Sequence, residues 1–281
     1  MEVNQTTLPT NLTNPAALSS STELTGEKRR FHAYNVGLPR TGTTSIAGIF
    51  GNFRVGHEFL DMETMLAITA YKKREIDEAG FERFVVDRDR KGNLEMDSSS
   101  YAAAYLPILV RRFPDAKFLF TIRDCWAWLN STINLTFAML AELPQWRIEY
   151  GTWGLGLKVN PEAFSSQDGF RKHLPDFAEG LLRHWAAANA DALANLPSER
   201  SLVLKTNEIA AQFPAISKLV GVSVDELVSE RSHLHKTKEN YGLLAGLEDG
   251  LLGQLGDCYC RPLMNRYFPL LQARSSAGVS G

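Results

Sequence analysis

The sequence has little cysteine, no long apolar run and almost no excess of charge, and each shortage excludes a class of protein. Three cysteines in 281 residues are too few for a disulfide framework. No apolar run approaches the roughly 18 residues that span a bilayer. The N-terminus also lacks the pattern of a secretory signal, so we expect a cytoplasmic protein without a membrane partner. The formal net charge is −2, which argues against a nucleic-acid partner because binding one requires a basic face.

The rest of the composition is that of an ordinary globular chain with weakly hydrophobic ends. Apolar residues make up 44% and charged residues 22%, so the chain can bury a core without a metal or disulfide. Residues 1–30 begin with a tract rich in Thr, Ser and Asn, and we expect a disordered or loosely attached tail. Residues 31–274 are expected to form one domain, and residues 275–281 a flexible C-terminus.

Apolar segments typical of strands alternate with helical patterns through the expected domain. Strands are expected at Phe31 to Val36, Lys117 to Ile122 and Ser201 to Lys205, and the apolar run Phe84 to Val86 ends in a charged turn, 87–92. Helices are expected from about residue 44, over 101–112 with a kink at Pro107, over 126–140 and over 170–195. Strands separated by helices imply crossover connections. The fold class is therefore α/β, a single domain with a central parallel sheet flanked by helices, whose ligands bind at the carboxyl ends of the strands.

The strongest local signal is the segment Gly37-Leu38-Pro39-Arg40-Thr41-Gly42-Thr43-Thr44-Ser45. It follows a strand and opens a helix, a context in which backbone N–H groups can hold an anion. A nucleoside-triphosphate P-loop reads G-x-x-x-x-G-K-[ST], but here Thr43 takes the lysine position and the nearest cation is Arg40. The segment predicts a P-loop-like strand-loop-helix with a displaced charge. A glycine-containing turn with a Ser/Thr helix cap is the alternative.

This loop resembles that of the PAPS-dependent sulfotransferases, whose 5′-phosphosulfate loop reads approximately P-[KR]-[ST]-G-T-[ST]. The family also implies an Arg at the end of a buried strand and a Ser eight residues later, which hold the 3′-phosphate of the nucleotide. Arg123 and Ser131 occupy those positions. The residue types fit, because Arg123 supplies a forked cation and Ser131 a hydroxyl donor. A strand-end ion pair between Arg123 and Asp124 is the alternative.

The resemblance implies a transferase that moves a sulfonate group from PAPS to a hydroxyl or amine of a small-molecule acceptor and releases PAP. The implied cofactor-binding residues are Arg40, Thr41, Gly42, Thr43, Thr44, Ser45, Arg123 and Ser131. Because an arginine and backbone donors can neutralise the transferred group, no metal is expected. A degenerate P-loop kinase and a nucleotide-binding pseudoenzyme stay open as alternatives, and so does the oligomeric state.

The resemblance implies three catalytic candidates, namely Arg40 and two possible bases that would take the acceptor's proton. Some family members place a Glu after the second strand, where this chain has Glu58, with His57 beside it. Histidine has the ordinary pKa closer to neutrality. Adjacent side chains of an extended segment point oppositely, so we expect one of the two to face the site. Leu94 to Ser99 lacks the Lys or His of many members, and the basic stretch Ser232 to Lys238 is either a closing loop or a solvated helix end.

Overall fold

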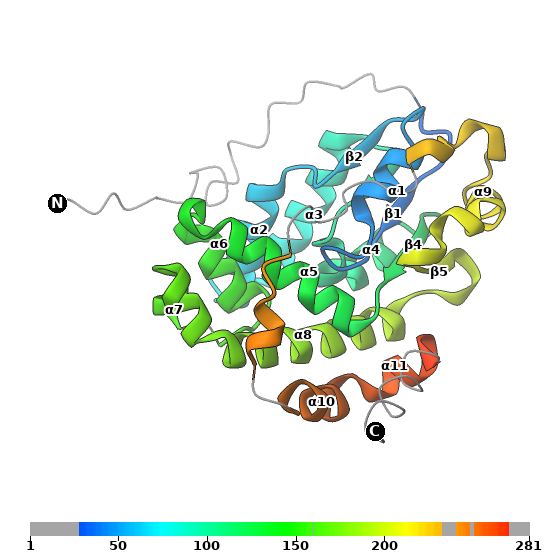
Figure 1. Cartoon of the computed structure of the whole chain (residues 1–281). Helices are drawn as coiled ribbons and strands as arrows, with labels where there is room; N and C mark the ends of the chain where they lie inside the picture. The colour runs from blue at the N-terminus through cyan, green and yellow to red at the C-terminus, as the bar shows by residue number, and fades with distance from the viewer. Residues whose placement is uncertain (1–27, 159, 232–239, 248–249, 270–281) are drawn as a thin grey trace.

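The computed structural model describes residues 28–158, 160–231, 240–247 and 250–269. Its strands are β1 (Ala33–Asn35), β2 (Val55–His57), β3 (Met96–Ser98), β4 (Lys117–Ile122) and β5 (Ser201–Lys205). They form one sheet in the order β2-β3-β1-β4-β5, and every neighbouring pair is parallel (Figure 1). The predicted α/β class with a central parallel sheet is therefore confirmed. The expected C-terminal segment 275–281 and the basic stretch Ser232 to Lys238 lie outside the described residues, as do residues 1–27.

The sheet separates two hydrophobic clusters, because successive side chains of a strand point to opposite faces. In β4, Phe118 and Phe120 belong to one cluster and Leu119 to the other. The Leu119 cluster contains apolar side chains of α1 (Thr43–Ile49) and α9 (Phe213–Val220). The opposite face is covered by α2 (Asp61–Lys72), α3 (Glu78–Gly92), α4 (Leu106–Arg112), α5 (Cys125–Ala138) and α8 (Leu174–Asn195).

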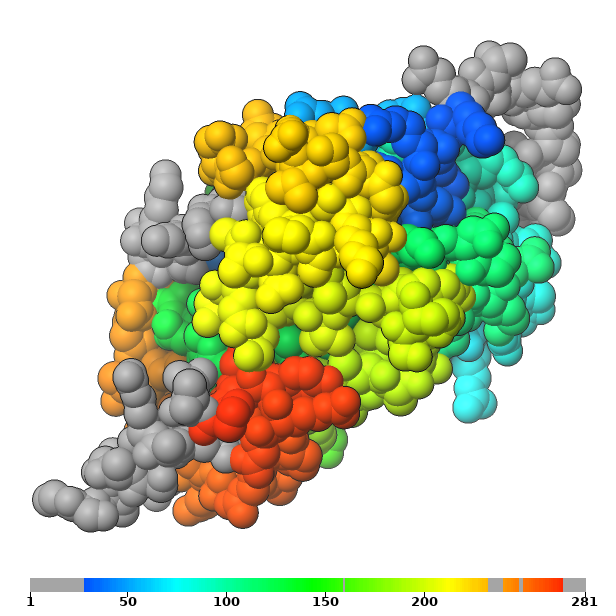
Figure 2. Space-filling view, turned by 90° about the vertical axis from the view of Figure 1, so that its right-hand side faces the viewer, coloured from blue at the N-terminus to red at the C-terminus, as the bar shows by residue number. Residues whose placement is uncertain are grey.

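Short helices complete the structure around these two layers. They are α6 (Gln145–Glu149), α7 (Gln167–Lys172), α10 (Leu251–Leu255) and α11 (Arg261–Tyr267), with a π-helical turn at Tyr150–Gly154. In Figure 1, α10 and α11 lie along α8, on the side of that helix away from the sheet. Figure 2 shows the chain around residues 200–231, in yellow, between the blue N-terminal part and the orange and red C-terminal part. None of the described helices is long and apolar enough to cross a membrane.

Three sequence-based boundaries differ from the structure, each for a local reason. Residues 87–92 are the last turns of α3 rather than a turn after Phe84 to Val86, and Asp77 caps that helix by accepting from Gly80 N at 2.7 Å. Pro107 stands in the first turn of α4, where proline is tolerated, so the helix begins there instead of kinking. The helix expected over 170–195 is broken at His173 into α7 and α8.

Side-chain contacts with the domain begin inside the segment 1–30 that was expected to be loosely attached. Arg29 Nη2 lies 3.0 Å from Asp89 Oδ1, and the Arg29 side chain is largely buried. Arg30 Nη1 lies 2.7 Å from Glu226 Oε1 in a more exposed pair. The described chain is therefore joined to the domain from Arg29 onward.

Candidate active site

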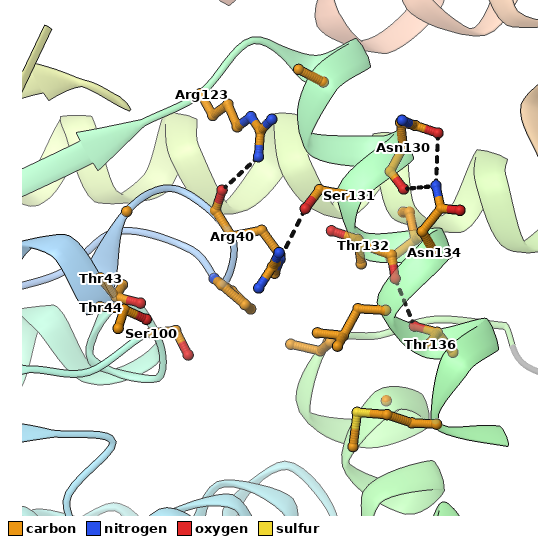
Figure 3. A pocket seen from close by; sticks show the side chains of 18 of the residues that line it. Arg40, Thr43, Thr44, Ser100, Arg123, Asn130, Ser131, Thr132, Asn134 and Thr136 are labelled. Atoms are coloured by element: carbon orange, nitrogen blue, oxygen red, sulfur yellow. Dashed lines mark hydrogen bonds between the residues drawn. The ribbon is translucent and has the colours of Figure 1, made fainter. Parts of the chain in front are cut away.

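A cavity of about 1150 Å³ opens at the carboxyl ends of the strands. The loop between β1 and α1 forms one wall, and the first turns of α5 form the opposite wall (Figure 3). The rest of the lining on the α5 side is mixed. Its apolar side chains are those of Leu135, Met139, Leu143, Ile148, Leu155 and Phe177, and its polar ones include Asn130, Thr132, Asn134, Thr136 and Arg147. The cavity thus joins a charged end near the loop to a more apolar end that also offers hydroxyl and amide groups.

Two glycines and a buried threonine give the loop after β1 its shape. A Cβ at Gly37 would lie 1.9 Å from Thr121 Oγ1, so β4 leaves no room for a side chain there. Gly42 has a φ of 106°, in the region that favours glycine. Thr41 Oγ1 donates to the Leu38 carbonyl at 2.6 Å and lies 2.9 Å from Thr121 Oγ1. The Thr41 side chain therefore holds the loop together, and it does not line the cavity as the other predicted loop residues do.

Two guanidinium groups and a serine come together beside this loop, as Figure 3 shows. Arg40 Nε donates to Ser131 Oγ at 2.9 Å, and Arg123 Nη1 donates to the Arg40 carbonyl at 3.2 Å. The sequence motifs that contain these residues are therefore in direct contact. Burial lowers the pKa of Arg40, and the neighbouring Arg123 charge lowers it further. Burial also lowers the pKa of Arg123, so an anion placed between the two cations would be strongly favoured.

Hydroxyl groups at the start of α1 face the same end of the cavity. Thr43, Thr44 and Ser45 all line it. His57 Nε2 lies 3.3 Å from Thr43 Oγ1 and 3.2 Å from Thr44 Oγ1. Ser98 Oγ donates to the Thr43 carbonyl at 2.7 Å, which ties β3 to the loop. The end of β2 and the start of α1 are thus parts of one site.

His57 and Glu58 both line the cavity, so the expectation that only one of them faces the site is wrong. That expectation assumed an extended backbone. Glu58 instead has a φ of 54°, and this left-handed conformation turns its side chain to the same side as that of His57. His57 Nε2 lies 3.8 Å from Glu58 Oε1. The structure therefore leaves both residues next to the loop.

The Glu58 carboxyl has a pKa near neutrality because it is poorly hydrated. Burial raises the pKa of Glu58 to about 7, although hydrogen bonds from Ser100 oppose the shift. Ser100 N donates to Glu58 Oε1 at 3.3 Å. Glu58 Oε2 is buried without a hydrogen-bond partner among the described residues. A carboxyl in this state can exchange a proton near pH 7.

Several cavity residues were not anticipated from the sequence. Thr206 and Asn207 directly follow β5 and line the cavity, and the rule that ligands bind at the carboxyl ends of strands could have identified them. Ser100 and Tyr101 follow β3, a strand of three residues that has no clear strand pattern. The Tyr101 ring stands at 88° to the Tyr150 ring, with centroids 5.7 Å apart. Both tyrosines line the cavity.

The described part of the chain contains no group of three or more His, Cys, Asp or Glu residues that could hold a metal ion. The charged side chains that line the cavity near the loop are Arg40, Arg123, Glu58 and Asp124, and Asp124 caps α5 by accepting from Ala127 N at 2.8 Å. The neighbouring guanidinium groups of Arg40 and Arg123 suit an anionic ligand.

Comparison with known proteins identifies a family for this chain. The model of a family described as a sulfotransferase domain matches residues 35–226. Among solved structures, a sulfotransferase from Alicyclobacillus acidocaldarius is similar, with 16% identity and a TM-score of 0.45 over 86% of this chain and 95% of that chain. A sulfotransferase from Mycobacterium avium gives 14% identity and a TM-score of 0.46 over 86% and 78%. No curated protein sequence gives a significant match.

Proposed function

The chain belongs to the sulfotransferase domain family, and from that premise we propose that it moves a sulfonate group from PAPS to a small-molecule acceptor and releases PAP. The acceptor group is a hydroxyl or an amine. The observation that carries the proposal is the contact between the β1–α1 loop and α5, which brings Arg40, Arg123 and Ser131 together. Family membership favours this function over a degenerate P-loop kinase, and the raised pKa of Glu58 favours an enzyme over a pseudoenzyme.

The residues present fit a nucleotide that carries one anionic group at the 3′ position of its ribose and another at the 5′ position. Arg40 and Arg123 have pKa values lowered by burial and, for Arg40, by its neighbour's charge. Such a pair of cations gains most from an anionic ligand, because the ligand relieves both effects. Arg123 and Ser131 would hold the 3′-phosphate, and Thr43, Thr44 and Ser45 would donate to the phosphosulfate. PAPS supplies the sulfonate group. The chain binds and orients PAPS and supplies the base that takes the proton of the acceptor.

In the proposed mechanism the chain contributes charge stabilisation, proton removal and exclusion of water. Arg40 stabilises negative charge as it grows on the leaving oxygen, an effect that is strongest in a site shielded from water. Glu58, in its ionised form, accepts the acceptor's proton. The apolar end of the cavity, with Leu135, Met139 and Ile148, holds the body of the acceptor. An acceptor with an apolar body therefore fits better than a multiply charged one.

Thermal stabilisation by PAP compared with ATP and Mg²⁺ tests the nucleotide preference directly. We expect PAP to raise the melting temperature and ATP with Mg²⁺ to have little effect, because only a ligand that binds the folded state stabilises it. Transfer from PAPS, measured with a panel of apolar alcohols, phenols and amines, should persist in EDTA. Phosphoryl transfer from ATP that stops in EDTA and is restored by Mg²⁺, with no transfer from PAPS, would favour the kinase instead. PAP binding without transfer to any acceptor would favour the pseudoenzyme.

Arg123→Ala is expected to weaken the binding of PAPS and PAP without weakening that of adenosine 5′-phosphosulfate. The two donors differ only in the 3′-phosphate that Arg123 would hold. Loss of one charge-assisted contact costs about 1.5–3 kcal/mol, or roughly 10- to 150-fold in affinity. Isothermal titration of the variant with PAP and with adenosine 5′-phosphosulfate measures both affinities.

Ser131→Ala serves as the matched variant for that measurement. It removes the acceptor of the Arg40 Nε hydrogen bond but leaves both cations in place, so the loss for PAP should be smaller. Equal weakening of both nucleotides by Arg123→Ala would show that Arg123 does not bind the 3′-phosphate.

A further inference from the structure

Arg88 on α3 is a buried cation that the proposed reaction does not use directly. Only 3% of the residue is exposed. Its guanidinium forms two hydrogen bonds with the Asp97 carboxylate of β3, Nη1 to Oδ2 and Nη2 to Oδ1. Nη2 and Nε also donate to the Phe59 carbonyl at 2.7 and 3.1 Å. Arg88 therefore connects α3, β3 and the segment that follows Glu58.

The segment that Arg88 holds has an unfavourable backbone conformation. Glu58 has a φ of 54° and Leu60 a φ of 51°, and each such residue costs of order 1 kcal/mol or more unless its surroundings hold it. The Phe59 carbonyl lies between the two. Two guanidinium donors meet at this carbonyl, so Arg88 contacts the backbone between the two residues with positive φ.

Packing around Phe59 supports the same conclusion. Its ring lies 5.5 Å from the Arg88 guanidinium carbon. A Cβ at Gly92 would lie 3.0 Å from the Phe59 ring, and a Cβ at Gly56 would lie 3.2 Å from Phe59 Cβ. The segment is thus packed against α3 and β2. Arg88 donates to its Phe59 carbonyl, Glu58 N donates to the Ser98 carbonyl at 3.2 Å, and the Leu60 carbonyl accepts from Thr64 Oγ1 at 2.6 Å.

We propose that Arg88, oriented by Asp97, is a positioning residue that holds Glu58 in the left-handed conformation needed for its side chain to face the cavity. The importance of Arg88 for catalysis rests on the proposed function, because Glu58 is the base only if the chain transfers sulfonate. The role in orienting the Glu58 carboxyl does not depend on that function. Arg88 itself does not line the cavity, so it acts through Glu58.

Other charged and titratable groups also influence the Glu58 carboxyl. The Asp97 charge raises the pKa of Glu58 and the Arg88 charge lowers it, so the intact pair has opposing effects. Within the described ranges, the other titratable groups that interact with Glu58 are His57 of β2, Tyr101 and Tyr105 of the segment after β3, and Tyr150 of the π-helical turn. A variant that keeps the Arg88 charge therefore separates position from charge.

Arg88→Lys is that variant, because lysine keeps the positive charge but cannot form the same fork to Asp97 and the Phe59 carbonyl. We expect turnover to fall about 10- to 100-fold, the size of effect that a small displacement of a catalytic group produces. PAP affinity should stay within about twofold, since the nucleotide-binding residues are untouched. In a Glu58→Gln background, Arg88→Lys should change turnover little, because coupled residues give non-additive effects.

Carbon-13 NMR titration of Glu58 supplies a readout that does not require activity. We expect the carboxyl to titrate near pH 7 in the native protein and at lower pH in Arg88→Lys, because a released side chain is better hydrated. Asp97→Asn removes the charge that raises the pKa of Glu58, so it should lower the titration through charge alone and measures the size of that effect. If Arg88→Lys fails to fold, Arg88→Gln separates position from charge by sign, because loss of the charge that lowers the pKa of Glu58 would raise the titration and release of the side chain would lower it.

Arg200→Lys is the matched control. Arg200 donates to the carbonyls of Phe113, Ala116 and Val110 and lies 5.2 Å from the Phe118 ring, so it has the same kind of contacts far from the cavity. The Arg200→Lys variant should lower the melting temperature without changing turnover or the pH at which Glu58 titrates.

The proposal is overturned if Arg88→Lys leaves the titration unchanged, or if the two lysine variants reduce turnover equally. Absence of sulfonate transfer in the native protein would instead refute the proposed function, while the titration still tests the position of Glu58.

Discussion

Arg40→Ala is expected to lower the turnover number about 100- to 1,000-fold, the range seen when a donor that stabilises developing charge is removed. The guanidinium faces the cavity between the loop and α5 (Figure 3). Charge grows on the leaving oxygen only as the bond to the sulfonate breaks, so the contact is stronger in the transition state than in the bound state. PAP affinity should therefore fall by less than about tenfold. Steady-state turnover with saturating PAPS, together with titration of PAP, measures both quantities.

Arg40→Ala leaves the backbone of the loop unchanged. Arg123 donates to the backbone carbonyl of Arg40, and alanine keeps that carbonyl. Arg40 has a φ of 67°, and alanine meets the same backbone strain, so the change removes only the guanidinium. Arg40→Lys keeps a charge and should restore part of the turnover. Parallel losses of affinity and turnover in Arg40→Ala would place Arg40 on the nucleotide rather than on the reacting bond.

The part of the site that could be predicted from the sequence is the part determined by local chain order. The β1–α1 loop and Arg123 each follow a buried strand directly, and parallel strands bring such segments to one edge of the sheet. The structure places Arg40, Arg123 and Ser131 at that edge. Their roles stay predictions, but their proximity follows from two short motifs and the topology of a parallel sheet.

The parts that could not be predicted depend on contacts between distant segments. In the sequence, Arg88 is one of five consecutive charged residues, 87–91, and nothing distinguishes it from its neighbours. In the structure it is buried and contacts Asp97 and the Phe59 carbonyl. The direction of Glu58 depends on a positive φ at a non-glycine residue, which no local pattern indicates. Thr41 fits the loop motif, yet its hydroxyl is used within the loop. Residue type and spacing could not distinguish these cases.

Glu58 connects these observations, because both its backbone and its side chain are in unfavourable states in the folded protein. Its backbone is strained, and one carboxylate oxygen is buried without a partner in the described structure. Groups in such states occur at functional sites, where the surrounding contacts maintain them. Arg40 and Leu60 also have positive φ values, but Glu58 combines that strain with a buried carboxylate oxygen that has no partner in the described structure. This combination is the structural argument that Glu58 has a chemical role.

Glu58→Gln is expected to lower the turnover number at least about 100-fold, since a general base contributes roughly 10²–10⁴ in rate. PAP affinity should not change, because the nucleotide-binding residues are untouched. The ionised carboxylate is the active form, and its pKa is raised to about 7. In the native protein kcat/KM should therefore rise with pH through about 7 and level off above it. This rise should be absent from Glu58→Gln, and a pH series of kcat/KM for both proteins tests it.

The dependence of stability on pH provides an independent test of the raised pKa of Glu58. Burial raises the pKa of Glu58 from 4.5 to about 7, so the folded state holds the proton more tightly than the unfolded state. Its contribution to stability is full below pH 4.5 and is lost as pH rises through about 7. Glu58→Gln should accordingly be more stable than the native protein at pH 8 by up to roughly 3 kcal/mol, and not at pH 4.

His57→Asn is the control variant for the turnover measurements. It should lower turnover much less than Glu58→Gln and leave the pH dependence of kcat/KM in place. The opposite ranking would assign the base to His57, and near-native turnover in both variants would exclude this segment as the source of the base.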